Sequence, residues 1–165
     1  MLSLSADKSV FKLLSMNKLI SKATIQIQKG PETVFEAIAD PEKMNQYFIR
    51  KGTGRIEAGA DLVWTFPEFD ETCPVKVGEV MPGVFISFVW DPETVVEITL
   101  KKQTDGSTVV VVTESGKRHD EQGVQWLTGQ TEGWANFLAC LKAYLEYGIN
   151  LRRGAFDFMR KEAGL

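Results

Sequence analysis

The segment near the C-terminus of this chain carries an apolar face long enough to cross a whole β-sheet. Its apolar residues fall at i, i+3, i+4, i+7, i+10 and i+11, the spacing of one side of a helix; they are Trp134, Phe137, Leu138, Leu141, Tyr144 and Leu145. Gly148 suits the position just past a helix end. A helix over residues 127–147 would be about 30 Å long. The rest of the chain must therefore supply a broad apolar partner.

Most of the preceding sequence has the period-2 pattern of half-buried strands. The alternating stretches are residues 23–27, 62–66, 75–77, 84–90 and 96–100, and a strand covered on both faces is predicted over residues 108–115. The turn Thr104-Asp105-Gly106-Ser107 precedes that last strand. Short turns between consecutive strands predict an antiparallel meander.

Two short helices are predicted between the first two strands. Pro31 occupies a plausible first helical position, and Asp40 before Pro41 can cap a second helix. The sequence thus predicts an α+β domain with a helix-grip arrangement, in which a curved antiparallel sheet wraps around a long C-terminal helix. Gly78, Gly83 and the adjacent Pro82 are the candidate bend or bulge points of the sheet.

Length and composition are those of an ordinary globular protein. The chain has 165 residues and a net charge of −3. This charge disfavours nucleic-acid binding. No apolar stretch approaches the ~20 residues of a membrane span.

We divide the chain into an N-terminal extension (1–17), a helix-grip domain (18–149) and a C-terminal appendage (150–165). Cys73 and Cys140 form neither a metal motif nor a disulfide framework, and reduced thiols fit a cytoplasmic location.

Three stretches of the chain carry a family resemblance. They are Gly30-Pro31-Glu32-Thr33-Val34-Phe35 with Asp40-Pro41-Glu42, then Gly78-Glu79-Val80 with Pro82, Phe88 and Trp90, and finally Gly133-Trp134, Leu138, Leu141-Lys142, Leu145-Glu146 and Gly148. Over about residues 19–148 the chain resembles the family of the activator of the heat-shock-protein-90 ATPase. That family belongs to the SRPBCC, or START-like, superfamily of helix-grip proteins, which includes the birch-pollen allergens. The resemblance implies the helix-grip fold and makes a chaperone an expected partner.

A curved sheet around a helix leaves room for a ligand cavity. The candidate lining residues are Trp64, Phe66, Phe88, Trp90, Ile98, Glu114, Trp134, Phe137, Leu138 and Leu141. Aromatic side chains fill protein cores and also line binding pockets, so both interpretations stay open for this set.

Glu114 shares its strand face with Val110 and Val112. The simpler interpretation places it at the exposed end of the strand. If it instead points inward, a buried carboxylate is costly unless it is paired. An inward Glu114 would then orient a ligand or act as an acid or base.

No catalytic constellation, metal site or cofactor motif is predicted. His119, the only histidine, stands among charged residues and is interpreted as a solvated loop residue. Arg50, Lys51 and Arg55 form a basic cluster without the glycine spacing of a nucleotide site.

We expect a non-enzymatic protein that binds a hydrophobic small molecule, lipid-like or polyketide-like, in the cavity. The alternatives are a regulator of a chaperone ATPase and a cyclase-like or hydrolase-like enzyme that uses Glu114 or His119. The appendage, with Phe156, Phe158 and Met159 beside two arginines, is expected to dock on the domain or to form a homodimer contact.

Overall fold

The computed structural model describes residues 17–163, so the expected N-terminal extension lies outside the described residues except for Asn17. The elements are β1 (Lys18–Ile27), α2 (Pro31–Ala39), α3 (Pro41–Met44), β2 (Lys51–Gly52), β3 (Asp61–Thr65), β4 (Thr72–Met81), β5 (Phe85–Val89), β6 (Val95–Lys102), β7 (Thr108–Arg118), α4 (Glu121–Tyr147) and α5 (Phe158–Ala163). The strands form one antiparallel sheet in the order β1-β7-β6-β5-β4-β3-β2.

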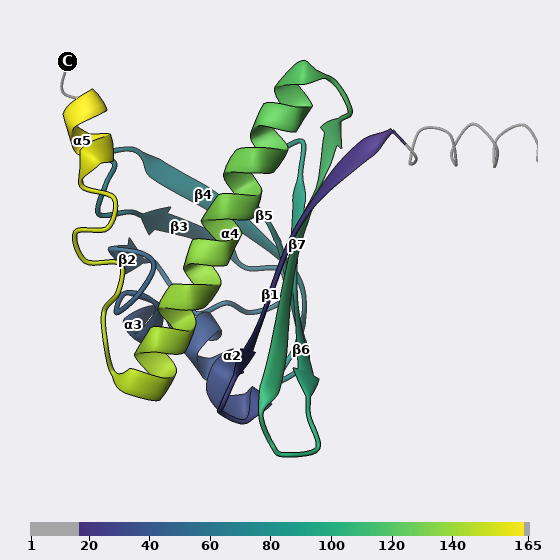
Figure 1. The fold of residues 1–165 in the computed structure, drawn as a ribbon, viewed down its shortest axis with the longest axis vertical. Coiled ribbons are helices and arrows are strands. Elements are labelled where there is room, and N and C mark those ends of the chain that lie inside the picture. The colour runs from purple at the N-terminus through teal and green to yellow at the C-terminus, as the bar shows by residue number, and fades with distance from the viewer. Residues whose placement is uncertain (1–16, 164–165) are drawn as a thin grey trace, which may run out of the picture.

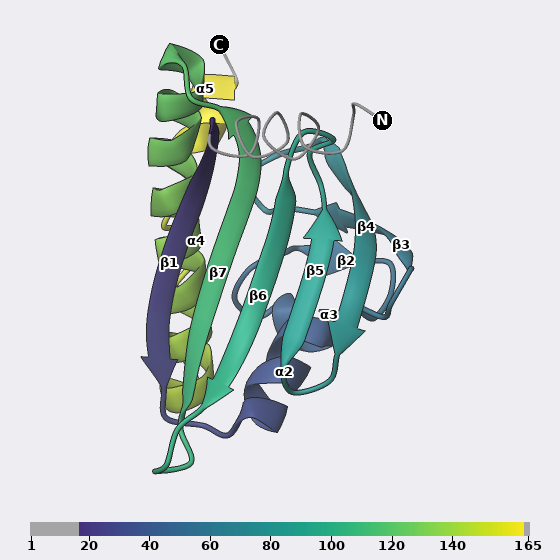
Figure 2. The ribbon, with the colours of Figure 1, turned by 90° about the vertical axis from the view of Figure 1, so that its right-hand side faces the viewer.

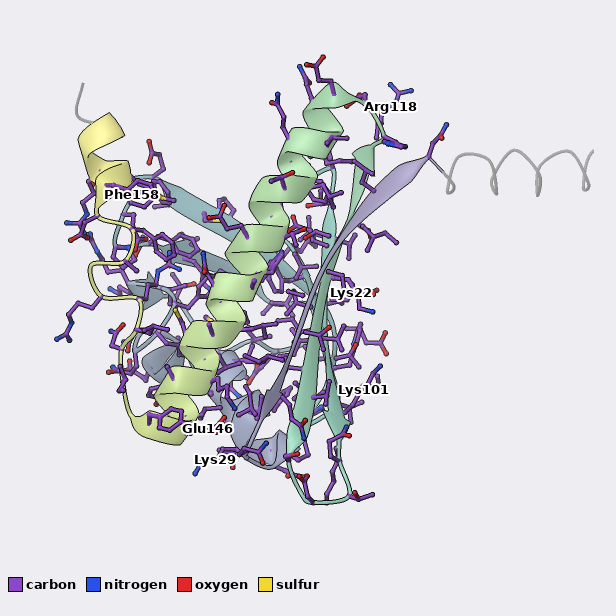
Figure 3. The ribbon with its side chains drawn as sticks, viewed as in Figure 1. Lys22, Lys29, Lys101, Arg118, Glu146 and Phe158 are labelled. Carbon is purple, nitrogen blue, oxygen red and sulfur yellow. The ribbon has the colours of Figure 1, made fainter. Side chains whose placement is uncertain are left out.

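The described helices all lie on one side of the sheet. In Figure 1 the sheet curves around α4, with α2 and α3 beside the lower half of α4, and Figure 2 looks onto the sheet face that carries none of the described helices. Lys22 on β1 and Lys101 on β6 point away from α4 (Figure 3) and are exposed. The predicted α+β helix-grip architecture is therefore confirmed, with the core enclosed between the sheet and α4.

Small side chains on β1 let α4 approach the sheet closely. Ser21 and Ala23 face the helix and are almost fully buried. The Ser21 hydroxyl lies 3.2 Å from the Thr131 hydroxyl of α4, within hydrogen-bond distance. A bulky residue at either β1 position would push the helix outward, because protein interiors have little spare volume.

Two side chains of α4 also bind the main chain at the end of β1, which is an edge strand. Lys142 Nζ donates to the carbonyl of Gln26 at 2.9 Å, and Glu146 Oε2 accepts from the amide of Gln28 at 3.2 Å. Lys142 and Glu146 form an ion pair with each other. Figure 3 shows Glu146 on the end of α4 near Lys29.

The long helix starts earlier than its apolar face predicts. It begins at Glu121 instead of residue 127, because the Asp120 carboxylate accepts a hydrogen bond from the Gly123 amide at 2.8 Å and caps the first turn. Gly123 packs so tightly that an added Cβ would lie 1.8 Å from the Arg118 carbonyl oxygen. The predicted end is confirmed, since Gly148 adopts the left-handed conformation with φ 64°.

A bulge at Gly78 bends the sheet as predicted. The register of β4 against β5 shifts between Val77 and Val80. A Cβ at Gly78 would lie 2.6 Å from the Ser87 hydroxyl, which accepts a hydrogen bond from the Glu79 amide. Val84, predicted to begin the next strand, lies instead in the tight turn before β5 because Gly83 turns the chain at φ 74°.

The two short helices close one end of the core. The Asp40 carboxylate accepts from the Glu42 amide at 2.9 Å, which confirms the predicted cap. Just past α3, Tyr47 donates its hydroxyl to the Ala37 carbonyl at 2.9 Å and stacks on Tyr144 of α4 with centroids 5.5 Å apart. Burial raises the pKa of Tyr47 well above its ordinary value.

Candidate functional site

A cavity of about 370 Å³ lies between one end of the sheet and the first half of α4. Its lining comes from the region after α3, the β3–β4 connection, the start of β4, the residue after β5, α4, and the segment after α4. The lining residues are Phe48, Phe66, Phe69, Glu71, Thr72, Cys73, Trp90, Gln130, Gly133, Trp134 and Arg152. We call this space the aromatic cavity.

The walls of the aromatic cavity are interlocked rings. Trp90 and Trp134 stack with centroids 5.2 Å apart and an interplanar angle of 25°. Phe48 and Phe66 meet edge to face at 5.3 Å. Such pairs are worth about 0.5–1.5 kcal/mol each beyond the area they bury. The walls are therefore held in place without a ligand.

Glu114 lies behind the tryptophan pair and accepts four hydrogen bonds. Oε1 accepts from Trp90 Nε1 at 3.0 Å and from the Thr94 hydroxyl at 2.8 Å. Oε2 accepts from Gln130 Nε2 at 2.7 Å and from Trp134 Nε1 at 2.8 Å. A carboxylate, which has only acceptor oxygens, matches this ring of donors. The bonds fix both indoles in the orientation that walls the cavity.

The simpler sequence interpretation of Glu114, an exposed strand end, is wrong. The side chain is 0% exposed. The reason is that β7 does not end near residue 115 but continues to Arg118, which pairs with Lys18 at the start of β1. Glu114 is therefore inside the ladder, on the same inward face as Val110 and Val112.

Arg152, in the segment after α4, covers the rim of the cavity. Its guanidinium donates to both oxygens of Glu68, from Nε at 3.2 Å and from Nη2 at 3.0 Å. It also lies over the rings of Phe48, Phe66 and Phe156 at 5.5, 6.0 and 4.9 Å. Cation–π contacts of this kind contribute about 0.5–2 kcal/mol each. The appendage thus docks on its own domain, one of the two arrangements expected.

Apart from Arg152, the lining contains few polar side chains. Glu71 and Thr72 are exposed at the rim, and Cys73 is half-buried. Burial raises the pKa of the Cys73 thiol above its ordinary value. Gln130 contributes an amide from α4.

The ten candidate residues separate into two groups. Phe66, Trp90 and Trp134 line the aromatic cavity, and Glu114 supports two of them from behind. The other six are buried in the core; they are Trp64, Phe88, Ile98, Phe137, Leu138 and Leu141.

Trp64 differs from the stacked pair. It packs edge to face on Phe88 and Trp90. Among the described residues its Nε1 is the one buried side-chain nitrogen or oxygen without a hydrogen-bond partner.

His119 and the basic cluster of Arg50, Lys51 and Arg55 are not part of the cavity lining. His119 is exposed, as interpreted. Arg55 donates to both carboxylate oxygens of Glu36, at 2.9 and 2.5 Å, and this pairing lowers the pKa of Glu36. Arg50 and Lys51 are exposed.

Several lining residues were not among the sequence candidates. They are Phe48, Phe69, Glu71, Thr72, Cys73, Gln130, Gly133 and Arg152. Phe69, Glu71 and Arg152 come from connections, and Gln130 and Gly133 come from α4 positions that are not apolar, so no periodic pattern marks these five. Thr72 and Cys73 begin β4, where Cys73 shares the parity of Val75 and Val77.

Within residues 17–163, no cluster of three or more His, Cys, Asp or Glu side chains could hold a metal ion. No helix in the same part of the chain is long and apolar enough to cross a membrane.

The fold and the matched stretch decide the family. The family model described as "Activator of Hsp90 ATPase homolog 1-like protein" matches residues 29–146. The chain belongs to this family. The match spans every strand of the sheet except β1, and nearly the whole of α4. No curated protein sequence matches the chain.

Solved structures support the same assignment. The crystal structure of protein SSP2350 from Staphylococcus saprophyticus is 33% identical, with a TM-score of 0.71 over 81% of this chain and 96% of that one. The solution structure of the Aha1 dimer from Colwellia psychrerythraea is 19% identical, with a TM-score of 0.64 over 79% of this chain and 98% of that one. The crystal structure of DynU16, from the dynemicin biosynthetic locus, is 23% identical, with a TM-score of 0.71 over 79% of this chain and 48% of that one. At such identities the last two likenesses concern the fold alone.

Proposed function

We propose that this family member binds a small hydrophobic molecule, lipid-like or polyketide-like, in the aromatic cavity. The observation that carries the proposal is a cavity of about 370 Å³ with five aromatic side chains in its lining. That volume falls within the range of small-molecule pockets. The hydrogen bonds to Glu114 hold two of the rings in place, so little ordering is required when a ligand enters.

The expected affinity follows from the buried area. A ligand that buries about 300 Å² of apolar surface gains roughly 7 kcal/mol from leaving water. Lost translational and rotational freedom opposes this gain. We therefore expect dissociation constants in the micromolar range or weaker for simple aromatic compounds.

Two glycines of α4 provide a matched test. Gly133 lines the aromatic cavity, whereas Gly129, one turn earlier, lines only a neighbouring hollow with Phe69 and Phe156. A Cβ at either position would meet nothing within 4 Å. Leucine at either site should raise helix stability by about 0.5–1 kcal/mol. Only Gly133→Leu places side-chain atoms in the aromatic cavity.

The experiment measures binding of 1-naphthalenemethanol, a neutral aromatic alcohol, by calorimetry and by tryptophan emission. We expect the wild type and Gly129→Leu to bind it alike, and Gly133→Leu to lose binding while staying folded. Binding that survives in Gly133→Leu would place the ligand elsewhere. Absence of binding to the wild type, for this compound and a panel of aromatic and lipid-like compounds, would contradict the proposal.

The surroundings of Glu114 favour this function over catalysis by that carboxylate. Both of its oxygens are occupied by hydrogen bonds from the protein, and Trp90 and Trp134 stand between it and the cavity. A general acid or base must come within hydrogen-bond reach of its substrate. The arrangement supports a role in holding the walls rather than in proton transfer.

Family membership supports a second candidate function, regulation of a chaperone ATPase of the Hsp90 type. Its test is the ATPase rate of the chaperone with saturating full-length protein. Stimulation that persists in Gly133→Leu would separate this function from ligand binding. An unchanged rate with the wild type would exclude it.

Assembly and location complete the proposal. The dimer described for the Colwellia protein supports the proposal that this chain forms a homodimer. Sedimentation at several protein concentrations tests this proposal.

The free thiols of Cys73 and Cys140 support a reducing compartment such as the cytoplasm.

A further inference from the structure

We propose that the aromatic cavity selects aromatic ligands that carry an amine and disfavours aromatic carboxylates. This inference rests on the proposed binding function and specifies its ligand class. It follows from the charges and hydrogen-bonding groups that remain unpaired around the cavity.

The positive charge in the lining is already neutralised. Arg152 is the cationic side chain of the lining, and both oxygens of Glu68 accept hydrogen bonds from it. The two side chains are 15% and 4% exposed, so the pair is largely withdrawn from water. A ligand carboxylate that recruited Arg152 would leave Glu68 as an uncompensated buried charge, which is costly.

The negative charge in the lining is not neutralised. Glu71 is exposed at the rim, and among the described residues no Lys, Arg or His nitrogen lies within 4.0 Å of its carboxylate. Arg50 and Arg160 line a separate hollow that also includes Glu71, yet neither pairs with it. The aromatic cavity therefore presents an unpaired carboxylate to an incoming ligand.

Gln130 adds a hydrogen-bond acceptor to the lining. Its Nε2 donates to Glu114, and this bond determines which end of the amide faces the carboxylate. Among the described residues no hydrogen bond reaches the carbonyl Oε1, and because Gln130 lines the cavity, Oε1 is the acceptor that it can offer to a ligand. A ligand amine can donate to Oε1, whereas a ligand carboxylate would be repelled by it.

The ring faces favour the same choice. Aromatic faces carry a partial negative charge and attract cations. Arg152 already lies over Phe48 and Phe66, which shows that this cluster accommodates a cation. Trp90, Trp134 and Phe69 offer further rings in the same lining.

Three naphthalene derivatives of similar shape separate the contribution of ligand charge to binding from the contribution of the apolar ring. They are 1-naphthalenemethylamine, 1-naphthalenemethanol and 1-naphthoate, which are cationic, neutral and anionic at pH 7. Calorimetry with the full chain should give the tightest binding for the amine, intermediate binding for the alcohol, and binding about tenfold weaker than the amine for the carboxylate.

Two glutamate variants test whether the preference for the amine comes from Glu71 at the rim. Glu71→Gln should reduce the preference for the amine over the alcohol about threefold and leave the alcohol unchanged. Glu79 is an exposed glutamate of β4 that lies outside the lining. Glu79→Gln should change neither the preference for the amine nor the binding of the alcohol.

The outcomes distinguish this inference from the proposed function. If the carboxylate binds as tightly as the amine, or if Glu71→Gln leaves the preference intact, the inference fails while cavity binding stands. If none of the probes binds, and the wider panel fails as well, the proposed function fails too.

Discussion

The indoles of Trp90 and Trp134 lie nearly parallel, 5.2 Å apart between centroids, and both donate their N–H groups to one buried carboxylate. Trp90 follows strand β5, and Trp134 lies in the middle of α4. Glu114 thereby ties the end of the sheet to the helix at the back of the cavity.

Replacing Glu114 by glutamine should destabilise the protein by about 2–5 kcal/mol. Glutamine presents an NH₂ group where the carboxylate presented an acceptor, so two of the four donors lose their partner. Equilibrium unfolding in urea measures the change. Glu97→Gln, an exposed glutamate on β6, is the control and should lie within about 0.5 kcal/mol of wild type. Equal stability of the two variants would show that the hydrogen-bonded ring contributes nothing.

Replacing Arg152 by methionine should cost about 2–3 kcal/mol and loosen the segment after α4. Methionine keeps much of the apolar stem but leaves the buried Glu68 without its cation. The neighbouring Arg153 is exposed, and Arg153→Met serves as the control. Urea unfolding and amide exchange of residues 149–160 report the two effects. Similar results for both variants would show that the segment does not depend on this ion pair.

Cys73 should report occupancy of the cavity. Its thiol lines the cavity, whereas Cys140 is 4% exposed in the core and serves as an internal control. Because burial raises the pKa of Cys73, its alkylation by iodoacetamide should rise with pH and reach half-maximum above the ordinary thiol value. Saturating 1-naphthalenemethylamine should slow that reaction several-fold, as measured by mass spectrometry of the two peptides. An unchanged rate with bound probe would place the ligand outside the aromatic cavity.

The pair formed by Glu36 and Arg55 should contribute stability only above acidic pH. Arg55 lowers the pKa of Glu36 in the folded state. A depressed folded pKa adds stability above the unfolded pKa of about 4.3, and this stability is lost as the pH falls through the folded value. Both side chains are about 40% exposed, so the contribution is at most about 1 kcal/mol.

Urea unfolding of wild type and Glu36→Gln at several pH values checks this dependence. The difference in stability should be present at pH 7 and vanish near pH 3. Glu32→Gln, an exposed first-turn glutamate of α2 without an ion pair among the described residues, should show a smaller difference at pH 7. A difference for Glu36→Gln that persists near pH 3 would assign it to packing instead.

The fold could be predicted because its signals are local. Alternation along the strands and the apolar face of α4 are read within a few residues, and Gly148 marks the end of the helix by its backbone conformation alone. The start of α4 was missed because its first turns carry few buried residues. Only the Asp120 cap marks the start, and a cap is a weaker signal than an apolar face.

The cavity could be predicted only in part because strand parity does not say where the core ends. Trp64 and Phe66 share one parity, as do Phe88 and Trp90. In each pair the first residue is inside its strand and buried, whereas the second lies just past the strand end and reaches the cavity. That distinction depends on strand length and on the path of α4.

The contacts that Lys142 and Glu146 make with the end of β1 have a consequence for self-association. An edge strand with free main-chain groups is a template for pairing with another chain. In this protein two such groups, the Gln26 carbonyl and the Gln28 amide, are bound by side chains of the helix that walls the cavity, so lifting α4 would expose them together with the apolar core. A molecule seated between α4 and the sheet would hold the helix down, and so would protect the protein against strand-to-strand aggregation.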